Sequence, residues 1–230
     1  MEFNEIINGK ILKVWEDYQK ESGDYLPILY PPFKRDGILF IGLNPSFNKT
    51  FFEKKLGKDY KKELGKKSKN ITLIIQLESD AIKDDGYSFF KKFHKISKEL
   101  GIPFQHIDLF YFRDTNQDNT KDRIGIGKKK NVPTKLNNFA LGQLKIAIEM
   151  IVEINPQIII VANAFASDII TNCDLFKINN DNFEKEGYDI LEIEKQKIPI
   201  IFSSMLTGQR ALDTHTFRRL KWHIKRIINR

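Results

Sequence analysis

The sequence predicts an α/β fold in which helices cover both faces of a central, mainly parallel sheet, that is, a three-layer αβα sandwich. Short apolar runs such as residues 38–41 and 158–162 lack alternation, which is typical of strands buried on both faces. Stretches with apolar residues at helical spacing separate these runs. A chain of 230 residues without an internal repeat or a long linker suits one core. We therefore expect a single domain over residues 1–230.

The N-terminal third supplies one helix, one strand and a basic excursion. Apolar residues at helical spacing predict a helix over residues 3–18, and the prolines of residues 27–32 then favour extended backbone. The buried strand at 38–41 ends in a turn at 42–46. Lysines crowd residues 54–70, where Gly57 and Gly65 interrupt any helix, so we expect a mobile or partly helical excursion over the surface.

The middle of the chain contains one ambiguous segment and one long loop. Residues 71–77 fit a strand or a buried helix equally well. A helix over residues 89–100 is closed by Gly101, and residues 104–109 form the second predicted strand. Residues 110–133 have no apolar periodicity, and a loop of this length is usually functional or disordered.

The C-terminal half continues the alternation of helices and strands. The predicted elements are a helix over 136–151, a strand at 158–162, a short helix at 164–171, an edge strand at 188–193, a buried strand at 198–202 and a basic helix over 216–230. Because ligands bind beyond the carboxyl ends of parallel strands, three strand exits are candidate sites: residues 42–46, 110–115 and 203–210.

Composition excludes several classes of protein. A single cysteine, Cys173, excludes a disulfide framework and a thiolate zinc cluster, and four scattered histidines give no metal-ligand pattern. No stretch reads as a signal peptide or a membrane span, so we expect a cytoplasmic protein without metal or cofactor. The excess of 38 Lys and Arg over 30 Asp and Glu gives a net charge of +8. That charge fits either a generic lysine-rich surface or a nucleic-acid footprint.

The first strand exit places one amide side chain in a rigid turn. Asn44 follows Gly42 and Leu43, and Pro45 fixes the backbone after it. An Asn carbonyl held in this way accepts a hydrogen bond from a water molecule and orients it, although it cannot take up the proton. The alternative is an Asx turn in which Asn44 serves only its own backbone.

Residues 38–46, ILFIGLNPS, resemble the first motif of the uracil-DNA glycosylase superfamily, in particular its mismatch-specific and single-strand-selective monofunctional branches. Those branches carry Gly-x-Asn-Pro-Gly after the first strand, and their Asn positions the attacking water. Residues 85–91 are similar to the segment where the family keeps an aromatic that stacks on the flipped base, and residues 156–166 resemble the helix–strand–helix step that follows. The resemblance extends to the order of elements and implies a glycosylase-like αβα fold.

The resemblance implies a monomeric, monofunctional DNA glycosylase of base-excision repair, which acts on uracil or another damaged base in single- or double-stranded DNA. Asn44 would be the catalytic residue. The base would lie against the backbone at Gly42 and Leu43 and stack on an aromatic: Phe47, Phe89 or Phe90. Leu206 would be the intercalating wedge, and the DNA backbone would contact Ser46, Ser203, Ser204, Arg210, Arg218 and Arg219.

The last strand exit departs from the family pattern. The family has His-Pro-Ser or Asn-Pro-Ser there, and its His stabilises the uracil anion, whereas this chain has Ser203-Ser204-Met205. Met205 and Leu206 are alternatively caps of the core, with Gly208 in a turn. His215 is either a replacement for the missing His or a residue in the first turn of a helix capped by Asp213 or Thr214. Two other functions therefore stay open: a nucleic-acid-binding module that has lost catalysis, and an enzyme of free nucleosides or nucleotides.

Overall fold

The computed structural model describes residues 2–46, 48–65, 68, 70–126, 136–208 and 211–229. The chain divides into two compact units. The first unit comprises Met1–Phe33, Asn44–Tyr87 and Asp108–Ile146, and the second comprises Lys34–Leu43, Ser88–Ile107 and Ala147–Arg230. Each unit is thus assembled from segments that are distant in the sequence. The single-domain organisation stays a prediction.

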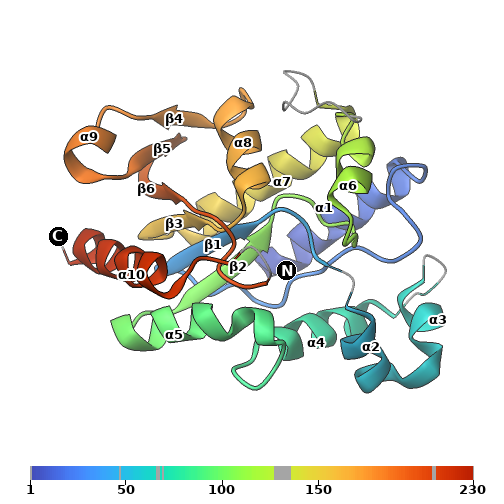
Figure 1. Ribbon diagram of the computed structural model, residues 1–230. Helices are drawn as coiled ribbons and strands as arrows, with labels where there is room; N and C mark the ends of the chain where they lie inside the picture. The colour runs from blue at the N-terminus through green and yellow to red at the C-terminus, as the bar shows by residue number, and fades with distance from the viewer. Residues whose placement is uncertain are drawn as a thin grey trace. The chain divides into compact units, whose positions relative to one another are not determined.

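The second unit contains a mixed, mostly parallel sheet (Figure 1). Its order is β2-β1-β3-β6-β5-β4, where β1, β3 and β6 run parallel and β6, β5 and β4 run antiparallel. The strands are β1 (Ile38–Gly42), β2 (Phe104–Asp108), β3 (Ile158–Val161), β4 (Lys177–Asn179), β5 (Asp189–Ile193) and β6 (Gln196–Phe202). This arrangement confirms the α/β fold and the mainly parallel central sheet.

The central strands lack alternation because both of their faces are buried. Every residue of β1, β2 and β3 is buried, and Ile38 pairs with Ile158 in a register that continues to Ile41 and Val161. Strands that bury both faces are typical of parallel sheets with helices on either side. The carboxyl ends of β1, β3 and β6 consequently meet at one edge of the sheet.

The helices of the second unit are η2 (Ser88–Phe90), α5 (Lys91–Leu100), α8 (Ala164–Asn172), α9 (Phe183–Glu186) and α10 (Thr214–Ile228). Of these, α5, α8 and α10 contact the sheet. Phe93 of α5 stacks on Phe40 of β1 with ring centroids 4.4 Å apart, while α8 and α10 both contact β3. Gly101 ends α5 in the left-handed conformation at φ 70°, as the sequence predicts.

The first unit is mainly helical. Its elements are α1 (Phe3–Asp17), α2 (Lys49–Leu56), η1 (Gly57–Asp59), α3 (Tyr60–Leu64), α4 (Ile71–Ile82), α6 (Gln117–Arg123) and the start of α7 (Asn138–Ile154), which continues into the second unit. Its core includes the rings of Tyr30, Tyr111, Phe112 and Phe139. The extended segment near Tyr30 is fixed to α1 by the Asn8 amide, which donates to the Tyr30 carbonyl and accepts from its N–H.

The structure decides two open points and corrects two predictions. Residues 71–77, which fit a strand or a helix, belong to α4, and the basic excursion at 54–70 is partly helical, in α2, η1 and α3. Within residues 110–133, the structure places α6 and three buried aromatics, so the described part is no open loop. Strand β5 is not at the edge, because β4 pairs with it on the outer side.

In the described part of the chain, no helix has the length and apolar character needed to span a membrane.

Candidate active site

The turn after β1 is joined to the loop after β2 by two reciprocal hydrogen bonds within the first unit. The Nδ2 of half-buried Asn44 donates to the Asp114 carbonyl at 2.7 Å. The Asp114 N–H in turn donates to the Pro45 carbonyl at 3.2 Å. The contact between Nδ2 and the Pro45 carbonyl is much longer, 3.5 Å. Asn44 therefore serves a loop 70 residues away rather than an Asx turn of its own.

The bond to Asp114 fixes which way the Asn44 amide faces. A backbone carbonyl only accepts, so the NH₂ group must lie on the Asp114 side and Oδ1 on the other. The Thr120 hydroxyl lies 3.4 Å from Oδ1, but the same hydroxyl is closer to the Asn116 carbonyl, at 3.2 Å. Since one hydroxyl carries one proton, Oδ1 retains acceptor capacity. The result is a carbonyl oxygen with a fixed direction and room for a further donor such as water.

The loop that receives the Asn44 amide is braced by the Asp114 carboxylate. That side chain is only 10% exposed, and it accepts from the Asn116 N–H at 2.9 Å and faces Arg123 Nε at 3.4 Å. Arg123 also donates to the Glu21 carbonyl at 2.7 Å. The Asp114 carboxylate therefore stabilises the loop after β2.

A buried polar cluster occupies the same unit. The Arg113 guanidinium pairs with Glu78 and lies 5.3 Å from the centre of the Phe52 ring. The backbone N–H of Asp108 donates to the Tyr30 hydroxyl at 3.1 Å. Burial, aided by the Glu78 charge and opposed by Arg113, raises the pKa of the Asp108 carboxyl to about 8. Burial likewise raises the pKa of Tyr30 well above its usual value. Arg113, in the loop after β2, therefore lies close enough to the Asp108 carboxyl to affect its pKa.

The predicted base-contacting residues differ in accessibility. Gly42 and Leu43 are buried as whole residues at the end of β1, so in this structure they do not expose a surface to a base. Phe90 is only 7% exposed, within a ring cluster that includes Phe93 and His106, so it is a core side chain. Phe89 is half-buried beside it and is the more accessible candidate. Phe47 lies outside the described residues.

His106 has no acid–base role in this ring cluster at neutral pH. Burial lowers its pKa to about 3, so the imidazole is neutral. Its ring stacks on Phe93 with centroids 5.7 Å apart. This histidine is therefore a core side chain of the ring cluster.

The predicted phosphate-contacting residues belong to both units. Ser46 is exposed in the first unit, and Ser204, Arg218 and Arg219 are exposed in the second. Ser203 is half-buried, and its N–H donates to the Val161 carbonyl of β3 at 2.9 Å. Ser203 follows β6 and Gly42 is the last residue of β1, so the two lie at the same edge of the sheet, on either side of β3. Arg210 lies outside the described residues.

Leu206 does not have the exposure that an intercalating wedge needs. Its side chain is 1% exposed, and Gly208 after it adopts φ 92°, a left-handed turn conformation. The core-capping alternative therefore describes Leu206, and the wedge assignment is corrected. A leucine in a polar loop gives no sign in the sequence of which way its side chain faces.

The helix-capping interpretation of the segment before α10 is confirmed. The Asp213 carboxylate accepts from the N–H groups of His215 and Thr216 at 2.8 and 3.0 Å. Hydrogen bonds from the Thr216 hydroxyl and backbone lower the pKa of Asp213 to about 2. His215 is exposed in the first turn of α10, as expected for a residue after an N-cap.

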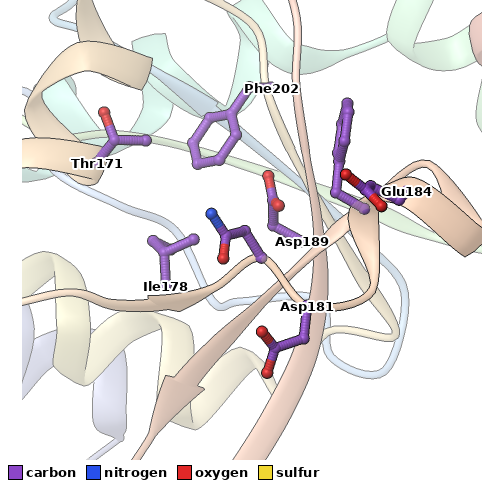
Figure 2. A pocket seen from close by; sticks show the side chains of 8 residues that line it. Thr171, Ile178, Asp181, Glu184, Asp189 and Phe202 are labelled. Atoms are coloured by element: carbon purple, nitrogen blue, oxygen red, sulfur yellow. The ribbon is translucent and has the colours of Figure 1, made fainter.

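The second unit has a cavity of about 770 Å³ (Figure 2). Carboxylates of Asp181, Glu184 and Asp189 line it together with Thr171, Ile178, Asn180, Phe183 and Phe202. Burial raises the pKa of Asp189, and no ion pair links these three carboxylates to another described residue. An anionic lining repels phosphate groups, so this cavity is no nucleic-acid site. The described residues also include no group of three or more His, Cys, Asp or Glu suited to a metal ion.

No protein-family model matches this sequence, and the search of curated proteins gives no significant relative. The site is therefore defined by its own geometry. The signal that sequence reasoning missed is the pairing of Asn44 with Asp114 and Thr120, which lie 70 and 76 residues further along the chain. Nothing in the local pattern around Asn44 indicates those partners.

Proposed function

We propose that this chain is a monofunctional DNA glycosylase-like protein that removes uracil or another damaged base from DNA. The observation that carries the proposal is the Asn44 amide, whose nitrogen is held by the Asp114 carbonyl and whose oxygen keeps acceptor capacity. The turn that holds it follows the buried strand β1, and ligands of parallel α/β sheets bind beyond such strand ends. The three-layer, uracil-DNA glycosylase-like arrangement of helices is part of the same proposal.

The proposed reaction is hydrolysis of an N-glycosidic bond in a flipped nucleotide. The bond between the sugar C1′ and the base nitrogen breaks through an oxocarbenium-like state, and the electron pair leaves with the base. A water oxygen then bonds to C1′, and its proton ends on solvent or on the departing base. Oδ1 of Asn44 orients that water by accepting one of its hydrogens, without taking the proton. Backbone N–H groups beside Asn44 would donate to the developing anion, and an aromatic side chain would stack on the base.

The last strand exit sets the expected rate. Ser203 and Ser204 bear hydroxyls suited to a phosphate, but this segment offers no imidazole to the base anion. We therefore expect slow excision, best measured with enzyme in excess over substrate. Some activity should remain, because positioning of the water by Asn44 and stabilisation of the base anion contribute to the rate separately.

A single-turnover assay tests the proposed activity. Labelled oligonucleotides containing uracil, hypoxanthine or xanthine, single-stranded and in duplex, are incubated with excess protein and then treated with alkali to cleave abasic sites. We expect an abasic product from at least one substrate and intact strand before the alkali step. The absence of product from every substrate would overturn the proposal, and cleavage before alkali would contradict the monofunctional mechanism.

The second candidate is a nucleic-acid-binding module without catalysis. It is favoured by Ser203-Ser204-Met205 at the exit where the resembling family has a catalytic His, combined with exposed arginines on α10. It predicts oligonucleotide binding that weakens as salt rises, with no base release at any enzyme concentration. The same assay, with binding measured in parallel, separates the two candidates.

A further inference from the structure

One face of α10 carries a row of cations around an exposed tryptophan. Arg218, Arg219, Trp222, Lys225 and Arg226 are all exposed, and their spacing of one, four, seven and eight residues places them on one side of the helix. The opposite side of α10 is buried and consists of Phe217, Leu220, Ile224 and Ile227. This amphipathic helix therefore already has its apolar side covered by the protein.

Charge on the exposed face is uncompensated. Helix α10 contains no acidic residue. Lys221, at the border of the face, pairs with Glu99 of α5, but none of the four exposed cations of the row forms an ion pair with another described residue. Solvated lysines and arginines are common, but cations gathered on one side without a carboxylate are complementary to a polyanion.

Trp222 adds a chemical feature that a merely solvated face lacks. Its side chain is 60% exposed, whereas Trp15, the other tryptophan of the chain, is 5% exposed. The Arg226 guanidinium lies 5.5 Å from the Trp222 ring centre, within cation–π range. The contact restrains an indole that exposes a large apolar surface to solvent, so the ordering of this ring on binding costs less.

We propose that the exposed face of α10 binds single-stranded nucleic acid, with phosphates on Arg218, Arg219, Lys225 and Arg226 and an unpaired base stacked on Trp222. Residues 218 to 226 span about 12 Å of helix, so the four cations lie within reach of neighbouring phosphates of one strand. Stacking requires a base with a free face, which a paired and stacked duplex interior does not offer. The inference deepens the nucleic-acid-binding candidate by naming single strands as the ligand and Trp222 as the stacking residue, and this binding requires no cleavage of a glycosidic bond.

A membrane surface fits this face less well. Amphipathic helices that bind bilayers insert their apolar side, and here that side packs within the second unit. One indole remains for insertion. The row of cations beside a single aromatic instead matches the stacking platforms of single-strand-binding proteins.

The test measures anisotropy of fluorescein-labelled oligothymidylate across a range of salt concentrations. Four phosphate contacts predict a slope of log K against log salt of about −3. We expect Trp222→Leu to weaken binding by about tenfold with an unchanged slope, because the ring supplies stacking rather than charge. Arg218→Gln combined with Arg219→Gln should reduce the slope by about 1.4. Phe183→Ala, which removes another exposed aromatic of the second unit beside the acidic cavity, is the matched control and should bind as the wild type does.

Other ligands complete the test. An oligouridylate of equal length distinguishes RNA from DNA as the source of the strand, and a blunt duplex should bind more weakly than either with no dependence on Trp222. Equal affinity of Trp222→Leu and wild type for single strands would overturn the inference, as would Trp222-dependent binding confined to phosphatidylserine vesicles. If the wild type releases a base but Trp222→Leu binds single strands as tightly as the wild type does, the α10 inference is overturned and the proposed activity is not. Trp222-dependent binding without base release would overturn only the proposed activity.

Discussion

The amide of Asn44 has one end engaged and one end available. Its nitrogen donates to the Asp114 carbonyl at 2.7 Å, while its oxygen shares the Thr120 hydroxyl with the nearer Asn116 carbonyl. Because the amide nitrogen is already fixed, the amide oxygen has a set direction, and binding a water molecule costs little further side-chain entropy. This division lets a single residue hold two loops together and present an acceptor, and the two tasks are separable by experiment.

Removing the Asn44 side chain should have a measurable structural cost. Asn44→Ala deletes the bond to Asp114, and we expect a loss of about 1 kcal/mol in the free energy of unfolding. Asn137 is a control in the same unit, because its Nδ2 also donates to a backbone carbonyl, that of Arg123, at 2.7 Å, while its Oδ1 accepts from the Ala140 N–H at 2.9 Å. In urea denaturation, Asn137→Ala should therefore lose at least as much stability as Asn44→Ala. A much larger loss for Asn44→Ala would show that its role is chiefly structural.

Protonation of Asp108 should make stability depend on pH. Burial raises its pKa in the folded state to about 8, whereas an unfolded Asp titrates near about 4. Between these values the folded state holds a proton that the unfolded state has lost, so the free energy of unfolding falls as pH rises from about 4 to about 8. Asp108→Asn imitates the protonated carboxyl, and we expect it to flatten this fall in urea melts. An equally steep fall in the variant would exclude Asp108 as its source.

At the scale of elements, the stability of α10 depends on the cap of its first turn. The Asp213 carboxylate accepts two backbone N–H groups there, which otherwise have no partner in the helix. Asp213→Ala should lower the Tm by about 2–4 °C, and Asp213→Asn, which keeps a capping oxygen, should change it little. Thermal melts near neutral pH provide the measurement. Equal Tm values for wild type and Asp213→Ala would contradict the capping role.

Elements were predictable from the sequence where burial dictates the pattern and were not where partners decide it. The runs at β1 and β3 have a continuous apolar sequence because both faces are covered, so their identity was clear. Strand β4 has three residues with no apolar pattern and exists because β5 offers its edge. Residues 71–77 fitted two periods, and only the length of the finished helix α4 decides between them.

The candidate site shows the same division. The Asn44 turn was visible from Gly42 and Pro45, which are local features. Its partners Asp114 and Thr120, and the inward side chain of Leu206, follow from tertiary contacts and left no local trace. The exposure of Trp222 was not predictable, because the position of a tryptophan in a helix does not by itself show which face of that helix is covered.

At the scale of the whole molecule, charge is unevenly distributed. The net charge of +8 includes a row of cations on α10, whereas the cavity near β4 and β5 gathers three carboxylates. Both features belong to the second unit. A polyanion is therefore attracted to one part of this unit and repelled from another, which a uniform lysine-rich surface would not achieve.

The most direct measurement of the central claim is the single-turnover rate of base release by Asn44→Ala, compared with wild type and with Asn137→Ala. If Asn44 orients the attacking water, its loss should slow release by about 100-fold or more, while Asn137→Ala, with at least as large a loss of stability, should stay near the wild-type rate. Equal rates for all three proteins, each shown to be folded under the assay conditions, would contradict the role assigned to Asn44.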